Sequence, residues 1–170
     1  YHLIKEQTKI LVDALILSKS NYVVIYPNND LGSEIILDIY KKKLSNQENF
    51  RIFSSIRFEK FLTLLKHANH LIGNSSAGLR EAPFYGVPSI DIGTRQRGRL
   101  DGNKSPSVHH ADYNTEKLVA LIRKFFDNDI KYKSKKHFGD GKSRDRFLSI
   151  CSRENGFWKT TIQKQFIDLD

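Results

Sequence analysis

Two hydroxyl groups, an arginine and a carboxylate follow a short apolar run in residues 73–81, GNSSAGLRE. Hydroxyls and the free N–H groups at a helix start bind phosphate oxygens. A carboxylate beyond the first turn can accept hydrogen bonds from the two adjacent hydroxyls of a ribose. Ser75 and Ser76 stand where a helix would begin, Gly78 leaves room for a ligand or a neighbouring backbone, and Glu81 lies further along. The stretch therefore predicts a nucleotide site, with the diphosphate at the two serines and the ribose at Glu81.

Helix capping is the simpler explanation of the same residues. A serine before a helix commonly caps it and a glutamate complements the helix dipole, together worth about 1 kcal/mol. Residues 73–81 alone leave both interpretations open, and the sequence that follows them bears on the choice.

The surrounding pattern alternates short β-rich runs with helical stripes. The predicted strands are residues 22–26, 50–53, 70–72, 88–92 and 107–110, and the predicted helices lie around 4–15, 33–44, 58–65, 118–125, 145–153 and 157–166. Continuous apolar residues in 22–26 predict a strand covered on both faces, and Ser33 and Asp112 or Asn114 are predicted helix caps. The fold class is therefore α/β, a three-layer doubly wound, Rossmann-like parallel sheet with ligands at the carboxyl ends of its strands.

The length of 170 residues fits one domain with its own core. A doubly wound domain normally opens with a strand that becomes central in its sheet, whereas this chain opens with a helical pattern. We therefore expect a first strand, and further sequence, upstream of residue 1.

The single cysteine, Cys151, excludes an intramolecular disulfide and agrees with a reducing compartment, so the cytoplasm is the expected location. The sequence contains no membrane-length apolar run and no signal-peptide pattern, so no membrane association is expected.

The net charge of +9 invites a comparison with nucleic-acid-binding proteins. The densest basic run, residues 131–136, lies between two helical patterns, where a solvated surface is the expected explanation. The sequence has no zinc-finger or aromatic RNA-binding signature, so nucleic acid is not the expected partner.

Residues 139–142, Gly-Asp-Gly-Lys, lack the spacing of a phosphate loop and are predicted to cap the following helix. His109 and His110 would point to opposite faces of a strand, which argues against a metal site.

The continuation of the opening stretch resembles a known family. Residues 86–96 read GVPSIDIGTRQ, and with GNSSAGLREAP at 73–83 they resemble the UDP-N-acetylglucosamine 2-epimerase family, particularly its hydrolysing branch. The non-hydrolysing branch carries a stretch rich in Thr, Glu, Arg and Pro here, which residues 93–96 do not match. Weaker resemblance runs through residues 26–33, 57–68 and 137–146, so it covers most of the chain.

The resemblance implies a glycosyltransferase-B-like protein of two Rossmann-like domains with the active site between them. Residues 1–170 would be its second, C-terminal domain, which binds UDP. The family pattern implies UDP contacts for seven positions: Ser75, Ser76, Glu81, Arg95, Asn28, Asp30 and Ile56. Arg95 could hold phosphate oxygens with two parallel donors.

The reaction implied by the resemblance eliminates UDP from the sugar, takes the proton from carbon 2 and then adds water, which gives N-acetylmannosamine for sialic acid synthesis. The implied acid and base groups belong to the first domain, and a catalytic histidine belongs to a His-Pro pair that this sequence lacks, because His2 is followed by Leu3. No catalytic residue, metal or cofactor is therefore predicted in this chain, which alone should bind UDP weakly and turn over nothing. The expected partners are UDP, a UDP-N-acetylhexosamine, the N-terminal domain and further copies in a homo-oligomer.

Two alternatives remain. An enzyme of the same branch that acts on a UDP-diacetamido-trideoxy sugar, for legionaminic-type products, would share the UDP site. A non-catalytic nucleotide- or polyanion-binding domain would use the basic surface instead.

Overall fold

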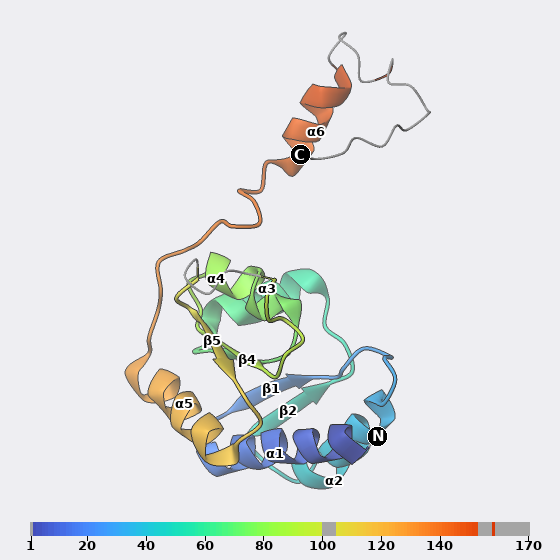
Figure 1. Ribbon diagram of the computed structural model, residues 1–170, viewed down its shortest axis with the longest axis vertical. Coiled ribbons are helices and arrows are strands. Elements are labelled where there is room, and N and C mark those ends of the chain that lie inside the picture. The colour runs from blue at the N-terminus through green and yellow to red at the C-terminus, as the bar shows by residue number, and fades with distance from the viewer. Residues whose placement is uncertain (1, 100–104, 153–157, 159–170) are drawn as a thin grey trace, which may run out of the picture. The chain divides into compact units, whose positions relative to one another are not determined.

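The computed structural model describes residues 2–99, 105–152 and 158 (Figure 1). The chain divides into two compact units, Tyr1–Lys135 and Lys136–Asp170. All strand pairs of the first unit are parallel, as the alternation of strands and helices predicts. One sheet pairs β1 (Tyr22–Ile25) with β2 (Phe50–Phe53), and the other has the order β3 (Leu71–Gly73), β4 (Ser89–Ile92), β5 (Val108–Ala111).

Three helices cover one face of the strands: α1 (His2–Ser18), α2 (Ser33–Leu44) and α5 (Thr115–Asn128). Figure 1 shows α1 and α2 running along one side of β1 and β2. The apolar stripe predicted for α5 is confirmed, because Leu118, Ile122 and Phe125 are fully buried in this core. Asn114 caps α5 by accepting a hydrogen bond from the Lys117 backbone N–H at 2.9 Å.

A smaller core lies under α3 (Phe58–His67) and α4 (Glu81–Phe84). It buries Leu65, Ala82 and Val87, with Leu71 of β3 packed against them. Helices on both faces of parallel strands make the three-layer arrangement expected from the sequence.

Contacts at both ends of the strands align the two sheets. The rings of Tyr22, at the start of β1, and His70, directly before β3, meet edge to face with centroids 6.4 Å apart. Beyond the strand ends, the Arg95 guanidinium after β4 lies 4.0 Å from the Asp30 carboxylate after β1. The carboxyl ends of the strands therefore lie at one edge, where ligands of doubly wound folds bind.

Two local predictions are wrong. β1 is not covered on both faces, because Val23 and Ile25 are 48% and 36% exposed while their neighbours turn inward. The strand buried on both faces is instead β4, although two of its four residues are polar. Ser33 does not cap α2: Gly32 holds that position in a left-handed conformation, with φ of 89°, and Ser33 is the first helical residue.

The segment after α5 is tied to the loop that follows α4. The backbone N–H of Tyr132 donates to the Gly86 carbonyl at 2.7 Å, and that of Lys135 donates to the Pro83 carbonyl at 2.9 Å. Gly86 has a φ of +68°, and a Cβ there would lie 2.0 Å from the Tyr132 carbonyl oxygen. Most side chains of the basic run are exposed, as predicted, while its backbone holds the segment in place.

The second unit contains α6 (Ser143–Ser152). Asp140 precedes this helix and accepts hydrogen bonds from the Lys142 backbone N–H at 3.1 Å and from Arg146 at 2.8 Å. The backbone hydrogen bond is the main reason that the pKa of Asp140 lies below its usual value. These contacts support the prediction that residues 139–142 cap a helix. The helical pattern predicted at 157–166 lies outside the described residues except for Trp158, whose indole donates to the Cys151 carbonyl. Among the helices that the structure describes, none has the length and apolarity to cross a membrane.

Candidate functional site

Ser75 and Ser76 follow β3, as predicted, but the element that starts there is not an α-helix. It is a single 3₁₀ turn, η1 (Ser76–Gly78), followed by the four-residue α4. The Ser75 hydroxyl oxygen accepts from the Ala77 N–H at 3.3 Å, and the Ser75 carbonyl accepts from the Gly78 N–H at 3.1 Å. Ser75 is therefore an N-cap, and two of the N–H groups expected to face an anion already have partners.

Gly78 contacts the buried strand β4. The Ser89 hydroxyl donates to the Gly78 carbonyl at 2.6 Å, and both residues are buried. A Cβ on Gly78 would meet Ser89 at 3.5 Å, an ordinary van der Waals distance. Of the two neighbours expected for Gly78, a ligand or another backbone segment, the structure shows β4, and this contact anchors η1 on the sheet.

A second bond joins the loop after β3 to the loop after β4. The side-chain amide nitrogen of Gln96 donates to the Asn74 carbonyl at 2.8 Å, although the two residues are far apart in the sequence. Asn74 directly precedes Ser75, and Arg95 directly precedes Gln96. This contact and the approach of Arg95 to Asp30 bring three of the predicted site regions to one edge of the sheet.

A buried acid lies under the loop that carries Arg95. Asp91 of β4 is 2% exposed, and its Oδ2 lies 2.7 Å from Nδ1 of His110, its register partner in β5. Burial, with a smaller contribution from the Asp91 charge, raises the pKa of Tyr113 above its usual value. The Tyr113 ring packs on Gly93, where a Cβ would lie 3.1 Å from it. The Tyr113 ring thus packs against the start of the loop that carries Arg95.

No contact among the described residues joins the remaining predicted site residues to one another. Glu81 is half-buried at the start of α4, five residues after Ser76. Asn28 is exposed in the loop after β1, and Ile56 is half-buried in the loop after β2. Asn28 and Ile56 lie just beyond the carboxyl ends of β1 and β2, whereas η1 separates Glu81 from the end of β3, and contact of all three with UDP stays a prediction.

His109 and His110 point to opposite faces of β5, as the alternation of side chains along a strand predicts. His109 lies against Phe125, with ring centroids 4.8 Å apart, and its Nε2 is 3.0 Å from the Tyr132 hydroxyl. His110, on the opposite face of β5, pairs with Asp91. Within the described part of the chain, no three His, Cys, Asp or Glu side chains form a group that could hold a metal ion.

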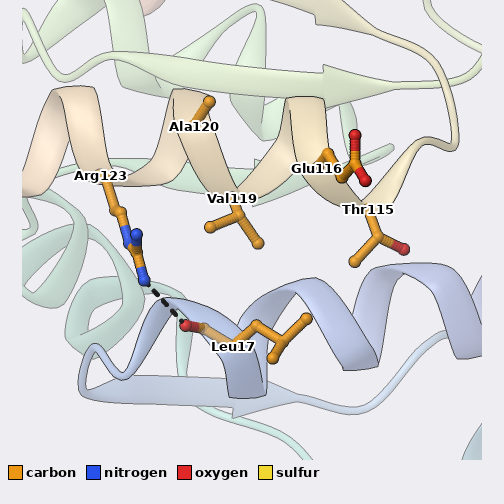
Figure 2. Close-up of a pocket in the computed structure, with 6 residues that line it drawn as sticks. All are labelled: Leu17, Thr115, Glu116, Val119, Ala120 and Arg123. Carbon is orange, nitrogen blue, oxygen red and sulfur yellow. Dashed lines mark hydrogen bonds between the residues drawn. The ribbon is translucent and has the colours of Figure 1, made fainter.

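One surface hollow lies between α1 and α5, away from the predicted site (Figure 2). It is lined by Leu17, Thr115, Glu116, Val119, Ala120 and Arg123. Figure 2 shows Arg123 reaching across to the Leu17 carbonyl, to which it donates at 3.3 Å. The lining is mostly apolar, and none of the predicted site residues belongs to it, so we do not assign the nucleotide to this hollow.

Three residues that shape the site were not among the predicted ones: Ser89, Asp91 and Gln96. The available signal for the first two was the presence of polar residues inside the strand pattern PSIDI. Buried polar side chains require hydrogen-bond partners, so such residues indicate anchors. Gln96 carried no comparable signal, because nothing in GTRQRGR marks one of its polar residues as buried.

The site and fold together define an α/β domain with polar loops gathered at the carboxyl edge of parallel strands. The family model described as UDP-N-acetylglucosamine 2-epimerase matches residues 4–152, and the chain belongs to this family. The chain is 44% identical over 172 residues to a UDP-N-acetylglucosamine 2-epimerase of Neisseria meningitidis serogroup B, covering 99% of this chain and 44% of that protein. It is 32% identical to a GDP/UDP-N,N'-diacetylbacillosamine 2-epimerase (hydrolyzing) of Campylobacter jejuni, covering 98% of this chain and 41% of that protein.

A solved structure agrees with the fold. The Methanocaldococcus jannaschii UDP-GlcNAc 2-epimerase, in complex with UDP-GlcNAc and UDP, matches with a TM-score of 0.67 at 22% identity, over 86% of this chain and 41% of that one. This match confirms the predicted Rossmann-like, glycosyltransferase-B-like fold. The chain spans less than half the length of each of these relatives.

Proposed function

We propose that this chain is the UDP-binding, C-terminal half of a hydrolysing UDP-N-acetylglucosamine 2-epimerase, which releases UDP and N-acetylmannosamine for sialic acid or related nonulosonate synthesis. The observation that carries the proposal is the meeting of the loops after β1, β3 and β4, through Arg95 with Asp30 and Gln96 with Asn74. Membership of the epimerase family supports the same ligand. The sequence of residues 93–96 supports the hydrolysing branch.

Arg95, Ser75 and Ser76 are the proposed diphosphate ligands. Both Arg95 and Asp30 are more than half exposed, so their ion pair contributes little stability and leaves the guanidinium accessible to phosphate oxygens. We assign to Asp30 the orientation of Arg95 at the rim of the nucleotide pocket. The Ser75 oxygen caps η1, and its O–H proton remains able to donate to phosphate. Glu81 would accept the ribose hydroxyls, with Asn28 and Ile56 lining the pocket.

Elimination of UDP breaks the bond between the anomeric carbon and the β-phosphate oxygen, while carbon 2 loses its proton. Negative charge develops on the departing diphosphate, where Arg95 and the two serines would stabilise it. Water then adds to the double bond and gives the C2-inverted sugar. The acid and base groups would come from an N-terminal half of the protein, so we expect this chain alone to be inactive. We further propose that the full protein acts in the cytoplasm as a homo-oligomer.

One observation supports a UDP-diacetamido-trideoxy sugar as a second candidate substrate. The Campylobacter relative is named for a diacetamido sugar and aligns along nearly the whole chain. A UDP-diacetamido-trideoxy sugar would place the same UDP on the same residues. Incubating the complete protein with each UDP-sugar and measuring UDP release decides between the two substrates.

Calorimetric titration of this chain with UDP tests the proposed site. Ser76→Ala and Glu81→Gln should each weaken UDP binding by about tenfold, the effect of one hydrogen bond to a charged group or ribose. Ser45→Ala, an exposed serine that follows α2 and precedes β2, serves as the control and should leave the affinity unchanged. Unchanged UDP affinity in both site variants would show that the nucleotide does not lie here. A chain that binds polyphosphate as tightly as UDP would favour the non-catalytic, polyanion-binding alternative.

A further inference from the structure

Gln96 differs from its neighbours in the loop after β4. Thr94, Arg95 and Arg97 are exposed, whereas the Gln96 side chain is only 1% exposed. The loop forms successive turns, with the Arg97 N–H bonded to the Thr94 carbonyl at 3.1 Å and the Arg99 N–H bonded to the Gln96 carbonyl at 3.2 Å. The loop therefore turns one polar side chain inward among residues that face solvent.

The buried amide of Gln96 is only partly satisfied. Its nitrogen donates to Asn74, while its oxygen Oε1 is buried and has no hydrogen-bond partner among the described residues. Burying an unpaired carbonyl oxygen costs roughly 1–3 kcal/mol, whereas an apolar side chain would bury the same volume without this cost. Stability alone therefore does not explain a glutamine at this position.

The bond from Gln96 joins the two parts of the proposed diphosphate site. It ends on the residue before Ser75 and begins on the residue after Arg95. On its other side the loop is held by an ion pair between Arg97 and Asp112, which follows β5. The loop thus contacts the loops on both sides of it, and the Gln96 bond sets its separation from the serines, because the largely exposed Arg97–Asp112 pair contributes little stability.

We propose that Gln96 is the positioning residue of the nucleotide site: its bond to the Asn74 carbonyl holds Arg95 at the distance from Ser75 and Ser76 that lets these groups grip one diphosphate. The inference rests on the proposed function. Gln96 does not itself contact the ligand, and it acts through Arg95.

The test measures UDP affinity of the 170-residue chain by calorimetry and unfolding by urea for two variants. Gln96→Met keeps the length and removes the donor, and Gln96→Asn keeps the amide but is one methylene too short to reach Asn74. Each should weaken UDP binding by about tenfold, the effect expected when Arg95 loses one hydrogen bond to the diphosphate. Gln47→Met makes the same exchange before β2, at the opposite end of the strands, and should leave UDP affinity unchanged. If Gln96→Met does not fold, Gln96→Asn decides.

A double-mutant cycle separates positioning from general support. In an Arg95→Ala background, Gln96→Met should change UDP affinity by less than about threefold, because interacting residues are not additive. An equal loss with and without Arg95 would overturn the inference, since a merely structural role is independent of Arg95. Unchanged affinity in both Gln96 variants, while Ser76→Ala weakens binding, would overturn it and leave the proposed function intact. Absence of UDP binding to the unaltered chain would refute the proposed function and this inference together.

Discussion

Substituting Gly86 by alanine should destabilise the first unit far more than the same change at other glycines with positive φ. A Cβ at Gly86 would lie 2.0 Å from the Tyr132 carbonyl oxygen, a backbone atom, so the segment after α5 has to move. That movement breaks the bonds from the Tyr132 N–H to the Gly86 carbonyl and from the Lys135 N–H to the Pro83 carbonyl. Two hydrogen bonds at about 1 kcal/mol each, added to roughly 1–2 kcal/mol for a left-handed alanine, predict a loss of about 3–4 kcal/mol.

Gly98 and Gly93 provide matched controls with nearly the same backbone conformation. Gly98 has a φ of +78°, and no atom of the described residues lies within 4 Å of the position that a Cβ would take, so Gly98→Ala should lose only the conformational part, roughly 1–2 kcal/mol. Gly93 has a φ of +80° with Tyr113 at 3.1 Å, and Gly93→Ala should fall between the two. Urea unfolding followed by circular dichroism gives the three free energies. A Gly86→Ala variant as stable as Gly98→Ala would refute the conclusion that the 132–135 segment is fixed to this loop.

Three further predictions concern burial and capping. Burial, and to a smaller degree the nearby Lys131 charge, lowers the pKa of His70 to about 4. As the pH falls through 6.5, the His70 side chain therefore becomes protonated in the unfolded chain while it stays neutral in the folded one. Unfolding free energy should therefore drop by about 2 kcal/mol between pH 7 and 5, and His70→Phe should flatten that dependence in urea titrations at both pH values. Ser89→Ala leaves the Gly78 carbonyl buried without its donor, and should cost roughly 1–3 kcal/mol and weaken UDP binding measured by calorimetry. Asn114→Ala should cost about 1 kcal/mol by loss of the cap, whereas Asn114→Asp should retain it in the same unfolding assay.

The sequence was sufficient to predict elements that depend on local pattern. The stripe of α5, its cap at Asn114 and the strand at residues 50–53 follow from residue spacing and capping chemistry. The exposure of one face of β1 could not be predicted, because a continuous apolar run does not determine which of its side chains a neighbouring helix will cover.

The sequence predicted where the candidate site lies in the fold better than how its side chains and turns are arranged. The sequence placed Ser75, Ser76 and Arg95 after strands, and the parallel topology brings such loops to one edge. It did not predict that a 3₁₀ turn replaces the start of an α-helix, because a capping serine precedes either kind of turn. The bond from Gln96 joins residues distant in the chain, and no local rule identifies such a pair.

The polar residues of β4 have a consequence for how the sequence can change over time. In most folds the central strand is free to exchange one aliphatic residue for another, while ligand-binding loops change under separate constraints. Here Ser89 holds the turn that carries the serines, and Asp91 bonds to His110 in the strand beside it. A substitution in this strand should therefore shift elements of the candidate site from a distance, and changes at Asp91 should be accompanied by changes at His110, because the two side chains bond to each other.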